Sequence, residues 1–343
     1  METPKRLAAI VLAAGDGTRL KSRFPKALHR VCGQPMLIHI LNVLSELKVE
    51  RTIVVVGYEE QEIRVYLKDN RELQFFRQSE RHGTGHATEI GMQGLLDWDG
   101  DVLVVNGDTP LITYNTLLAL LNRHRHLEAD ATLLTCELES PEGYGRVLRT
   151  DDNSVLSIVE HKDANRYERQ VREVNAGFYC FDSSSLRDAL KEVQPHNVQG
   201  EYYLTDAVKI LVDQGGRVEA VVADDSSEIL GVNNRIQLAT AEKILRRRIM
   251  DRHMLAGVTI LDPDTTYIDE EVEIGQDTII RPHTILQGPC RIGENCRIGP
   301  NAHLVSVVVG ERARLEDCVL RECEIGEGRR IQPTRVPGEP VAP

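Results

Sequence analysis

The chain has 343 residues, enough for two domains, and its apolar (41%) and charged (27%) contents are typical of a globular protein. A formal net charge of −12 and an aromatic content of 4% argue against a nucleic-acid or an anionic membrane surface as partner. Seven cysteines without a secretory signal predict a reduced, cytoplasmic protein, and no apolar run approaches the roughly 20 residues that span a bilayer.

Residues 1–232 alternate short apolar runs with helical patterns, which predicts an α/β domain with a Rossmann-like, mostly parallel sheet. The expected strands are Leu7–Ala13, Thr52–Val56, Leu73–Phe76, Val102–Val105, Ala131–Cys136, Val155–Val159, Val174–Phe181 and Val218–Val222. The expected helices include Met36–Leu47, Gln61–Leu67, His86–Met92, Tyr114–Arg125, Ser184–Glu192 and Thr205–Val212. Ligands of such sheets bind beyond the carboxyl ends of the strands, so the loops that follow strands are the candidate sites.

The first expected strand ends in a glycine loop. Gly15 and Gly17 follow the apolar run, and the cations Arg19 and Lys26 come next. Backbone N–H groups can approach an anion where no Cβ stands in the way, and glycine also tolerates positive φ. Leu20 replaces the third glycine of the dinucleotide fingerprint and no Gly-Lys-Ser/Thr follows, so neither the NAD-type nor the Walker motif fits. From this stretch alone, a tight turn with solvated charges remains the alternative.

A second loop with chemistry, Asn106-Gly107-Asp108, follows the expected strand Val102–Val105. A carboxylate at a strand end can hold Mg²⁺, which binds through one or two protein oxygens plus phosphates. An Asx turn or a helix cap is the alternative for Asp108. Asn233 could add a second oxygen ligand, but an Asn before a helix is usually an N-cap, and the residues alone favour the cap.

Three further polar clusters flank expected strands. The glycine loop from Gln78 to His86 suits a base or a sugar, and its two histidines are interpreted as solvated loop residues because no third metal ligand stands nearby. Glu160 and Asn175 could accept or donate hydrogen bonds to a sugar. Read singly, the glycine loop is better explained as a plain loop, and the other two clusters as polar residues in salt bridges at a sheet edge.

Beyond residue 232 the sequence period changes. Residues 233–256 predict one connecting helix, and residues 257–332 carry aliphatic residues at every sixth position. These are Ile274, Ile280, Leu286, Ile292, Ile298 and Leu304, after which the register slips and resumes at Val309, Leu315 and Ile325. A period of six predicts a short parallel β-helix of hexapeptide repeats. Cys290 and Cys296 share one hexad position and are interpreted as small apolar filler, and the Pro-rich tail 333–343 is expected to be disordered.

Together these motifs form a familiar series: LAAGxGTRL with a later PK, QxxxxGTGHA, NGDTPL, GYGR, VEHKDA, VNAG, QGEYYLTD and GVNNR, in this order. The chain resembles the N-acetylglucosamine-1-phosphate uridyltransferase half of the bifunctional GlmU family over residues 7 to 330. The opening motif marks sugar nucleotidyltransferases in general, and VEHKDA and QGEYYLTD narrow the resemblance to the uridyltransferase branch. The resemblance implies that the β-helix is left-handed and truncated.

The resemblance also implies roles for individual residues. Arg19 and Lys26 would hold the phosphates of the nucleotide, and Asp108 and Asn233 would coordinate Mg²⁺. Arg19, Lys26 and Asp108 would be the catalytic residues. For Asn233 this overrides the N-cap interpretation. The expected nucleotide-binding residues are Leu12, Ala13, Ala14, Gly15, Gln78, Gly83 and Thr84, with Asn106 and Gly107 beside the metal ligand. The expected amino-sugar ligands are Gly145, Glu160 and Asn175.

The implied reaction joins UTP and N-acetylglucosamine 1-phosphate into UDP-N-acetylglucosamine and pyrophosphate, with Mg²⁺, for cell-wall (peptidoglycan) precursor synthesis. The family also implies a homotrimer formed through the β-helix. Two local departures from the family pattern are Asp16, where many relatives carry Lys, and Asn106, which replaces a common Tyr. Because the sequence ends in prolines before the later coils of the family's acetyltransferase site, we expect no acetyltransferase activity.

Three alternatives stay open. Another sugar-1-phosphate nucleotidyltransferase, forming UDP-glucose or dTDP-glucose, would share the opening loop and Asp108. A non-catalytic regulatory homologue would use the fold for ligand sensing, although it need not retain Arg19, Lys26, Asp108 and Asn233. A structural scaffold built on the β-helix would not bind UTP.

Overall fold

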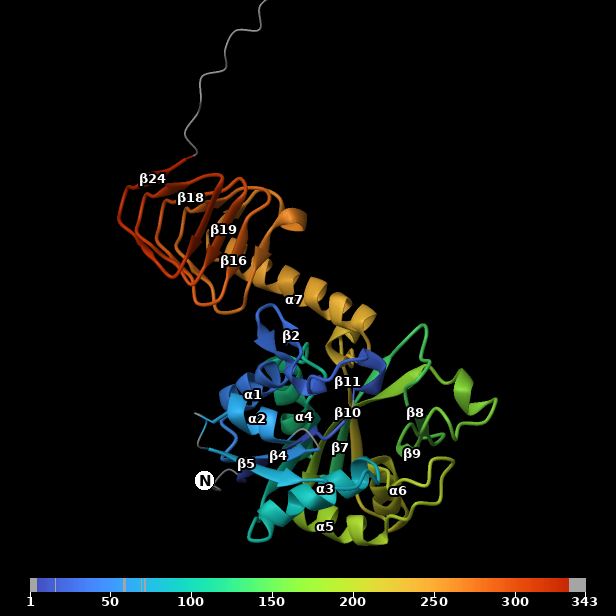
Figure 1. Cartoon of the computed structure of the whole chain (residues 1–343). Helices are drawn as coiled ribbons and strands as arrows, with labels where there is room; N and C mark the ends of the chain where they lie inside the picture. The colour runs from blue at the N-terminus through green and yellow to red at the C-terminus, as the bar shows by residue number, and fades with distance from the viewer. Residues whose placement is uncertain (1–4, 16, 58–59, 69, 71, 333–343) are drawn as a thin grey trace, which may run out of the picture. The chain divides into compact units, whose positions relative to one another are not determined.

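A computed structural model of the chain describes residues 5–15, 17–57, 60–68, 70 and 72–332. They form two compact units (Figure 1). The first takes in the chain up to His29 and Pro35–Leu238, and the second takes in Arg30–Gln34 and the chain from Ala239 onward. Asp16 and the tail 333–343, for which the sequence analysis made predictions, lie outside the described residues.

The first unit is built on one mixed sheet with strand order β11-β7-β10-β6-β1-β4-β5, to which β8 and β9 are joined through β10. β1 pairs in parallel with β6 on one side and β4 on the other, so the ends of β1 and β6 meet at one edge. The strands are β1 (Leu7–Ala13), β4 (Arg51–Val56), β5 (Leu73–Arg77), β6 (Asp101–Asn106), β7 (Ala131–Glu137), β8 (Arg146–Arg149), β9 (Val155–Val159), β10 (Glu173–Asp182) and β11 (Val218–Val222).

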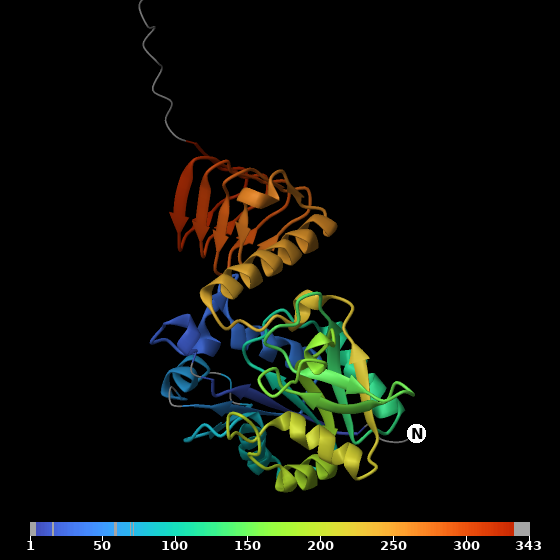
Figure 2. The same cartoon turned by 90° about the vertical axis from the view of Figure 1, so that its right-hand side faces the viewer.

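Helices cover both faces of this sheet (Figures 1 and 2). In β1, Ala9 and Val11 pack into the core beneath α1 and α4, while Ala8 and Ile10 pack into the core beneath α3, α5 and α6. A strand buried on both faces needs apolar residues at every position, which is why β1 reads as an unbroken apolar run. The helices are α1 (Met36–Glu46), α2 (Glu60–Tyr66), α3 (Thr84–Met92), α4 (Tyr114–His126), α5 (Ser183–Glu192), α6 (Leu204–Asp213) and α7 (Arg235–Leu255), the last continuing into the second unit.

Several of the loops contain short 3₁₀ helices. They are η1 (Thr18–Leu20), η2 (Lys26–Leu28), η3 (Gln93–Leu95), η4 (Glu168–Gln170) and η5 (Ser226–Ile229), with η6 (Pro263–Thr265) in the second unit. The first two of these hold Arg19 and Lys26 in the loop that follows β1.

β10 departs from the parallel order and shapes the site. It pairs antiparallel with both β6 and β7, and its register shifts between Asn175 and Tyr179. Gly177 lies in this irregular segment with φ of 77°, and a Cβ there would stand 2.2 Å from Asn106 Nδ2. A glycine is therefore required at this position, both for the backbone conformation and to leave room for the side chain that ends β6.

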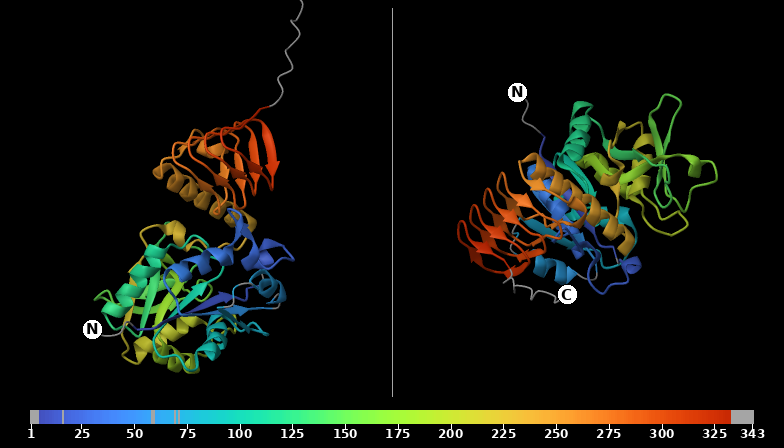
Figure 3. Two further views of the ribbon diagram at one scale, coloured as in Figure 1. Left: turned by 90° about the vertical axis from the view of Figure 1, so that its left-hand side faces the viewer. Right: turned by 90° about the horizontal axis from the view of Figure 1, so that it is seen from above.

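The second unit is a parallel β-helix whose coils stack in three sheets (Figure 3). The inward residues pair rung by rung, as Ile280 with Ile298 and Ile298 with Leu315. The three sheets contain β12 (Thr259–Ile260), β15 (Ile279–Ile280), β18 (Arg297–Ile298), β21 (Arg314–Leu315) and β24 (Arg330–Ile331); β13 (Tyr267–Ile268), β16 (Ile285–Gln287), β19 (Ala302–Val305) and β22 (Cys318–Arg321); and β14 (Glu273–Ile274), β17 (Arg291–Ile292), β20 (Val308–Val309) and β23 (Glu324–Ile325).

The sequence period of six is explained by this stacking. Ile280, Leu286, Ile298 and Leu304 are fully buried inside the coils, and the slip after Leu304 corresponds to a shorter corner at Ser306, whose φ is 52°. Cys290 and Cys296 are also fully buried, as expected of apolar filler. The predicted fold class, a Rossmann-like mostly parallel sheet followed by a left-handed β-helix of hexapeptide repeats, is confirmed.

Two short elements were missed. β8 carries Arg146 and Arg149 among its four residues, and the fully buried Arg146 hid the apolar alternation that signals a strand. The hairpin of β2 (Arg30–Val31) and β3 (Gln34–Pro35) is too short to give a period. In addition, α3 begins at Thr84 rather than His86, and α7 begins at Arg235 rather than Asn233.

Candidate active site

The loop after β1 brings two cations to the edge of the sheet. Gly17 adopts φ of 62°, as the sequence analysis anticipated, and a Cβ on it would approach Lys26 Cβ to 2.9 Å. Glycine is therefore required there for its backbone conformation and for the close approach of Lys26. At Gly15 a Cβ would meet nothing within 4 Å. Any need for glycine at position 15 must therefore come from a bound ligand and not from the protein itself.

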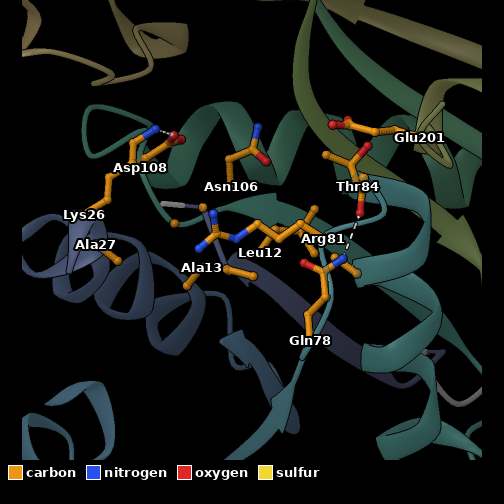
Figure 4. Close-up of a pocket in the computed structure, with 15 residues that line it drawn as sticks. Leu12, Ala13, Lys26, Ala27, Gln78, Arg81, Thr84, Asn106, Asp108 and Glu201 are labelled. Carbon is orange, nitrogen blue, oxygen red and sulfur yellow. Dashed lines mark hydrogen bonds and ion pairs between the residues drawn. The ribbon is translucent and has the colours of Figure 1, made fainter. Parts of the chain in front are cut away.

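A cavity of about 270 Å³ opens above the ends of β1 and β6 (Figure 4). It brings together all of the expected nucleotide-binding residues except Arg19. The described residues that line it are Leu12, Ala13, Ala14, Gly15, Lys26, Ala27, Gln78, Arg81, Gly83, Thr84, Ala87, Asn106, Gly107, Asp108 and Glu201. We call this space the nucleotide cavity.

The polar glycine loop that closes one side of the nucleotide cavity is fixed by its hydrogen bonds. Gln78 Nε2 donates to Gly83 O at 3.1 Å, and Thr84 Oγ1 accepts from Leu204 N at 3.1 Å. Gly83 has φ of 100°, and a Cβ there would stand 2.4 Å from Tyr202 O. The loop is thus held in place before any ligand binds.

A second cavity, of about 290 Å³, adjoins the first through Asn106 and Asp108, which line both. It contains the three residues expected to bind the amino sugar, together with Arg19 and Asn233. The described residues that line it are Arg19, Asn106, Asp108, Thr109, Glu142, Gly143, Tyr144, Gly145, Glu160, Asn175, Ala176, Gly177, Ile229, Gly231, Asn233 and Gln237. We call this space the sugar cavity.

The predicted cations and metal ligands meet where the two cavities join. Lys26 Nζ donates to a carboxylate oxygen of Asp108 and, at 2.8 Å, to Asn233 Oδ1. Arg19 donates to the same Asn233 oxygen at 2.9 Å. The side chains of Lys26 and Asp108 are only 11% and 28% exposed, so this pair is partly shielded from solvent.

The N-cap interpretation of Asn233 is wrong for a local reason. The side chain of its neighbour Asn234 accepts a hydrogen bond from Gln237 N at 2.9 Å and caps α7. Gln237 Oε1 in turn accepts from Asn233 N at 2.8 Å. With the cap supplied by Asn234, the amide of Asn233 is left to face Lys26 and Arg19.

In the sugar cavity, the two expected hydrogen-bonding side chains are oriented by neighbours. Asn175 donates to the Tyr179 hydroxyl at 2.6 Å and accepts from Gly177 N at 3.1 Å. The half-buried Glu160 accepts from Thr205 Oγ1 at 3.2 Å. A Cβ on Gly145 would lie 3.1 Å from Ile158 Cγ2 and 3.6 Å from the Glu160 carboxyl, so a larger residue would crowd this wall.

Burial raises the pKa of the Glu160 carboxyl, and the nearby carboxylates of Asp163, Asp206 and Glu201 raise it further. The Thr205 hydroxyl opposes this shift of the Glu160 pKa by donating to the charged form. Burial likewise raises the pKa of Asp206, as does Asp163. A polar, half-buried carboxyl with a raised pKa beside a cavity is typical of a ligand-binding position.

Six charged or polar residues that line the cavities were not among the predicted site residues: Arg81 and Glu201 in the nucleotide cavity, and Thr109, Glu142, Tyr144 and Gln237 in the sugar cavity. Arg81 stood within the quoted glycine loop, so its charge was a usable signal. Glu201 stood within the quoted motif QGEYYLTD, but Gln237 arrives from a segment far along the chain, and no quoted motif contains it.

The histidines of the glycine loop differ from the prediction that both are solvated. His82 lies 2.9 Å from Glu80 and is partly exposed, but His86 lies on α3 with Nδ1 3.1 Å from Gln78 Nε2. Within the described ranges no group of three or more His, Cys, Asp or Glu side chains could hold a metal. Nor does the described part of the chain contain a helix long and apolar enough to cross a membrane.

Comparison with known proteins identifies the family. The family model for the MobA-like NTP transferase domain matches residues 9–201, and the bacterial transferase hexapeptide (six repeats) model matches residues 271–305. The chain is 46% identical over 329 residues to the bifunctional protein GlmU of Caldanaerobacter subterraneus subsp. tengcongensis, covering 96% of this chain and 71% of that protein. The chain belongs to the GlmU family.

Other GlmU proteins give the same result. The chain is 46% identical over 325 residues to that of Geobacillus sp. (strain WCH70), and 45% identical over 325 residues to that of Listeria innocua. Each match covers 95% of this chain and 70% or 71% of the relative. GlmU membership and the NTP transferase domain confirm the predicted enzyme class, UDP-N-acetylglucosamine pyrophosphorylase. These relatives are named bifunctional, so the predicted lack of acetyltransferase activity gains no support and stays a prediction.

Proposed function

We propose that the chain transfers the uridylyl group of UTP to N-acetylglucosamine 1-phosphate and releases pyrophosphate. The observation that carries this proposal is that the nucleotide and sugar cavities adjoin at Asp108 and Asn106, with Lys26 at the junction. When the donor and the acceptor are bound side by side in adjoining cavities, their reaction becomes effectively unimolecular, which lowers the entropic part of the activation barrier.

The reaction is a single in-line displacement. A phosphate oxygen of the sugar phosphate forms a bond to the α-phosphorus of UTP, and the bond from that phosphorus to the bridging oxygen breaks. The electron pair leaves with pyrophosphate. Because the attacking oxygen is already anionic, no general base is required, and catalysis rests on alignment and on stabilisation of negative charge.

Arg19 and Lys26 supply the positive charge at the junction. Arg19 lines the sugar cavity, where it can hold the phosphate of the incoming sugar, and Lys26 lines the nucleotide cavity. The Arg19 guanidinium and the Lys26 ammonium both donate to Asn233 Oδ1, so the two charged groups lie within one hydrogen-bonded cluster. Phosphate groups of the two substrates would compete with Asn233 for the Arg19 and Lys26 donors, and both substrates would then bind with their phosphates at this cluster.

The residues at the junction fit a magnesium ion. A carboxylate oxygen of Asp108 and the amide oxygen of Asn233 converge on one cation, the Lys26 ammonium, and oxygen donors of this kind suit a hard divalent ion. Asp108 and Asn233 would hold Mg²⁺, with the remaining ligands from phosphates and water. When bound, the ion supplies charge neutralisation on the substrate phosphates.

Glu160, Asn175 and Gly145 are proposed to select the amino sugar. The Glu160 carboxylate can accept a hydrogen bond from a sugar hydroxyl, and Asn175 is fixed by Tyr179 and Gly177 so that it can bind an amide or a hydroxyl of the sugar.

We also propose that the β-helix assembles as a homotrimer and that the enzyme is cytoplasmic. Light scattering that gives a monomer would refute the trimer.

The test is a panel of sugar 1-phosphates and nucleoside triphosphates, read by pyrophosphate release. We expect the highest kcat/KM with UTP and N-acetylglucosamine 1-phosphate, and little release with UTP alone. A preference for glucose 1-phosphate or dTTP would favour another sugar nucleotidyltransferase. No release, together with no thermal stabilisation by UTP, would favour a non-catalytic role. An arm with glucosamine 1-phosphate and acetyl-CoA tests the predicted lack of acetyltransferase activity.

A further inference from the structure

Arg81 reaches across the nucleotide cavity from the loop between β5 and α3. Figure 4 shows its side chain passing in front of Leu12, with the guanidinium beside Ala13. Arg81 also lines a smaller adjacent cavity together with Gly15 and Lys26. Its charged end therefore lies next to the loop that follows β1, which is the loop proposed to bind phosphate.

The loop that carries Arg81 is anchored on both sides of it. Gln78 N donates to Val56 O at 2.9 Å, and Tyr202 N donates to His82 O at 2.6 Å. The Gln78 side chain then bonds Gly83 O across the loop. The main chain that carries Arg81 is thus fixed in front of the cavity, so binding by its side chain needs no ordering of the loop.

The charges around the nucleotide cavity make Arg81 important. Among the lining residues that the structure describes, the cations are Lys26 and Arg81 and the carboxylates are Asp108 and Glu201. Lys26 is paired with Asp108. Arg19, the other cation predicted for the phosphates, lines the sugar cavity instead. Without Arg81, these described side chains would carry a net negative charge, which opposes the binding of a triphosphate.

We propose that Arg81 is a further nucleotide-binding residue, whose guanidinium contacts the polyphosphate of UTP and the pyrophosphate product. The proposal rests on the proposed function of the nucleotide cavity. A guanidinium presents parallel N–H donors that match two phosphate oxygens, so it binds more strongly than a lysine ammonium at the same place. Arg81 thereby adds a second cation to the lining beside Lys26.

The experiment compares Arg81→Gln and Arg81→Lys with the wild type in the pyrophosphate-release assay. Loss of one charge-assisted hydrogen-bonding group should raise KM for UTP about tenfold in Arg81→Gln, with a smaller rise in Arg81→Lys. KM for N-acetylglucosamine 1-phosphate should be unchanged. Arg77→Gln is the matched control, because Arg77 lies four residues earlier, pairs with Glu60 and lines neither the nucleotide nor the sugar cavity.

Calorimetric titration separates phosphate contact from base contact. In Arg81→Gln, inorganic pyrophosphate should bind about tenfold more weakly while uridine binds as to the wild type. Weakening of uridine to the same extent, or no change for either ligand, would overturn the proposal. If Arg81→Gln does not fold, the same two titrations are made with Arg81→Lys, which should show a smaller weakening for pyrophosphate and none for uridine. If the wild type itself neither turns over UTP nor binds pyrophosphate, the proposed function fails, whereas a wild-type-like Arg81→Gln refutes only the assignment of Arg81.

Discussion

The nucleotide cavity and the sugar cavity are built in different ways from the same sheet. The nucleotide cavity is lined mainly by small residues and glycines at the ends of β1 and β6 and in the loop before α3. The sugar cavity also has glycines in its lining, but it adds polar side chains from β10, from the loops beside β8 and β9, and from the start of α7. The sugar cavity therefore offers a ligand more polar side chains than the nucleotide cavity does.

The two cavities also differ in charge. Among the described lining residues of the sugar cavity, the cation is Arg19 and the carboxylates are Asp108, Glu142 and Glu160. An anionic sugar phosphate entering this cavity is repelled by the carboxylates and attracted at Arg19. The phosphate end should therefore turn toward Arg19 and the junction with the nucleotide cavity, which orients the nucleophile.

The largest effect is expected where the two cavities meet. Asp108→Asn removes the carboxylate that both cavities share and should lower kcat by on the order of 10³-fold, because the charge balance of the junction and the magnesium ligand are both lost. Pyrophosphate release measures it. Asp213→Asn is the control, since Asp213 is an exposed partner of Lys209. More than a tenth of wild-type turnover in Asp108→Asn would contradict the assignment.

A pair of adjacent asparagines separates chemistry from stability. Asn233→Ala should lower kcat by about 10²-fold with little change in unfolding, because its amide oxygen serves Lys26 and Arg19. Asn234→Ala should keep turnover but lower the free energy of unfolding by about 1 kcal/mol, because it removes the cap of α7. Steady-state kinetics and urea titration measure the two. The assignment fails if the two variants behave alike.

The side-chain character of the sugar cavity predicts a selective KM effect. Glu160→Gln should raise KM for N-acetylglucosamine 1-phosphate about tenfold and leave KM for UTP unchanged, because a charge-assisted hydrogen bond is lost on one side only. The exposed Glu192→Gln serves as control. An equal rise for both substrates would show that the cavities do not act separately.

The raised pKa of Glu160 gives the effect a pH dependence. The carboxylate form accepts from the sugar, so affinity for the sugar phosphate should improve as pH rises through this raised pKa, and Glu160→Gln should lose that rise. The contribution of Glu160 to the stability of the fold changes with pH in the opposite direction. The folded protein holds a proton that the unfolded chain has released, so the contribution is full below the ordinary glutamate pKa and is lost as pH rises through the folded one. Thermal unfolding of both proteins across this range measures it.

How much the sequence could predict differs between the same two cavities. β1 was predicted to the residue, because burial on both faces leaves an unbroken apolar run, and the loop after it follows directly. The buried residues of the β-helix could likewise be predicted from their period of six. The bond between Arg19 and Asn233 joins residues 214 positions apart, so no local spacing contains it.

The remaining errors have physical causes. Asn233 and Asn234 are chemically identical, and the sequence does not show that Gln237 N donates to Asn234 while Gln237 Oε1 accepts from Asn233 N. Arg81 is visible as a charge in a loop, but the sequence does not give the direction of its side chain. β8 was hidden by the buried Arg146, because a guanidinium inside a strand breaks the pattern that marks one.

The central claim is that the adjoining cavities hold donor and acceptor together for one displacement. The stereochemical course tests it most directly: a single diastereomer of UTP carrying sulfur on the α-phosphorus is turned over with N-acetylglucosamine 1-phosphate, and the product is assigned by ³¹P NMR. One in-line displacement predicts inversion at phosphorus. Retention, which requires two displacements through a uridylylated protein, would contradict it.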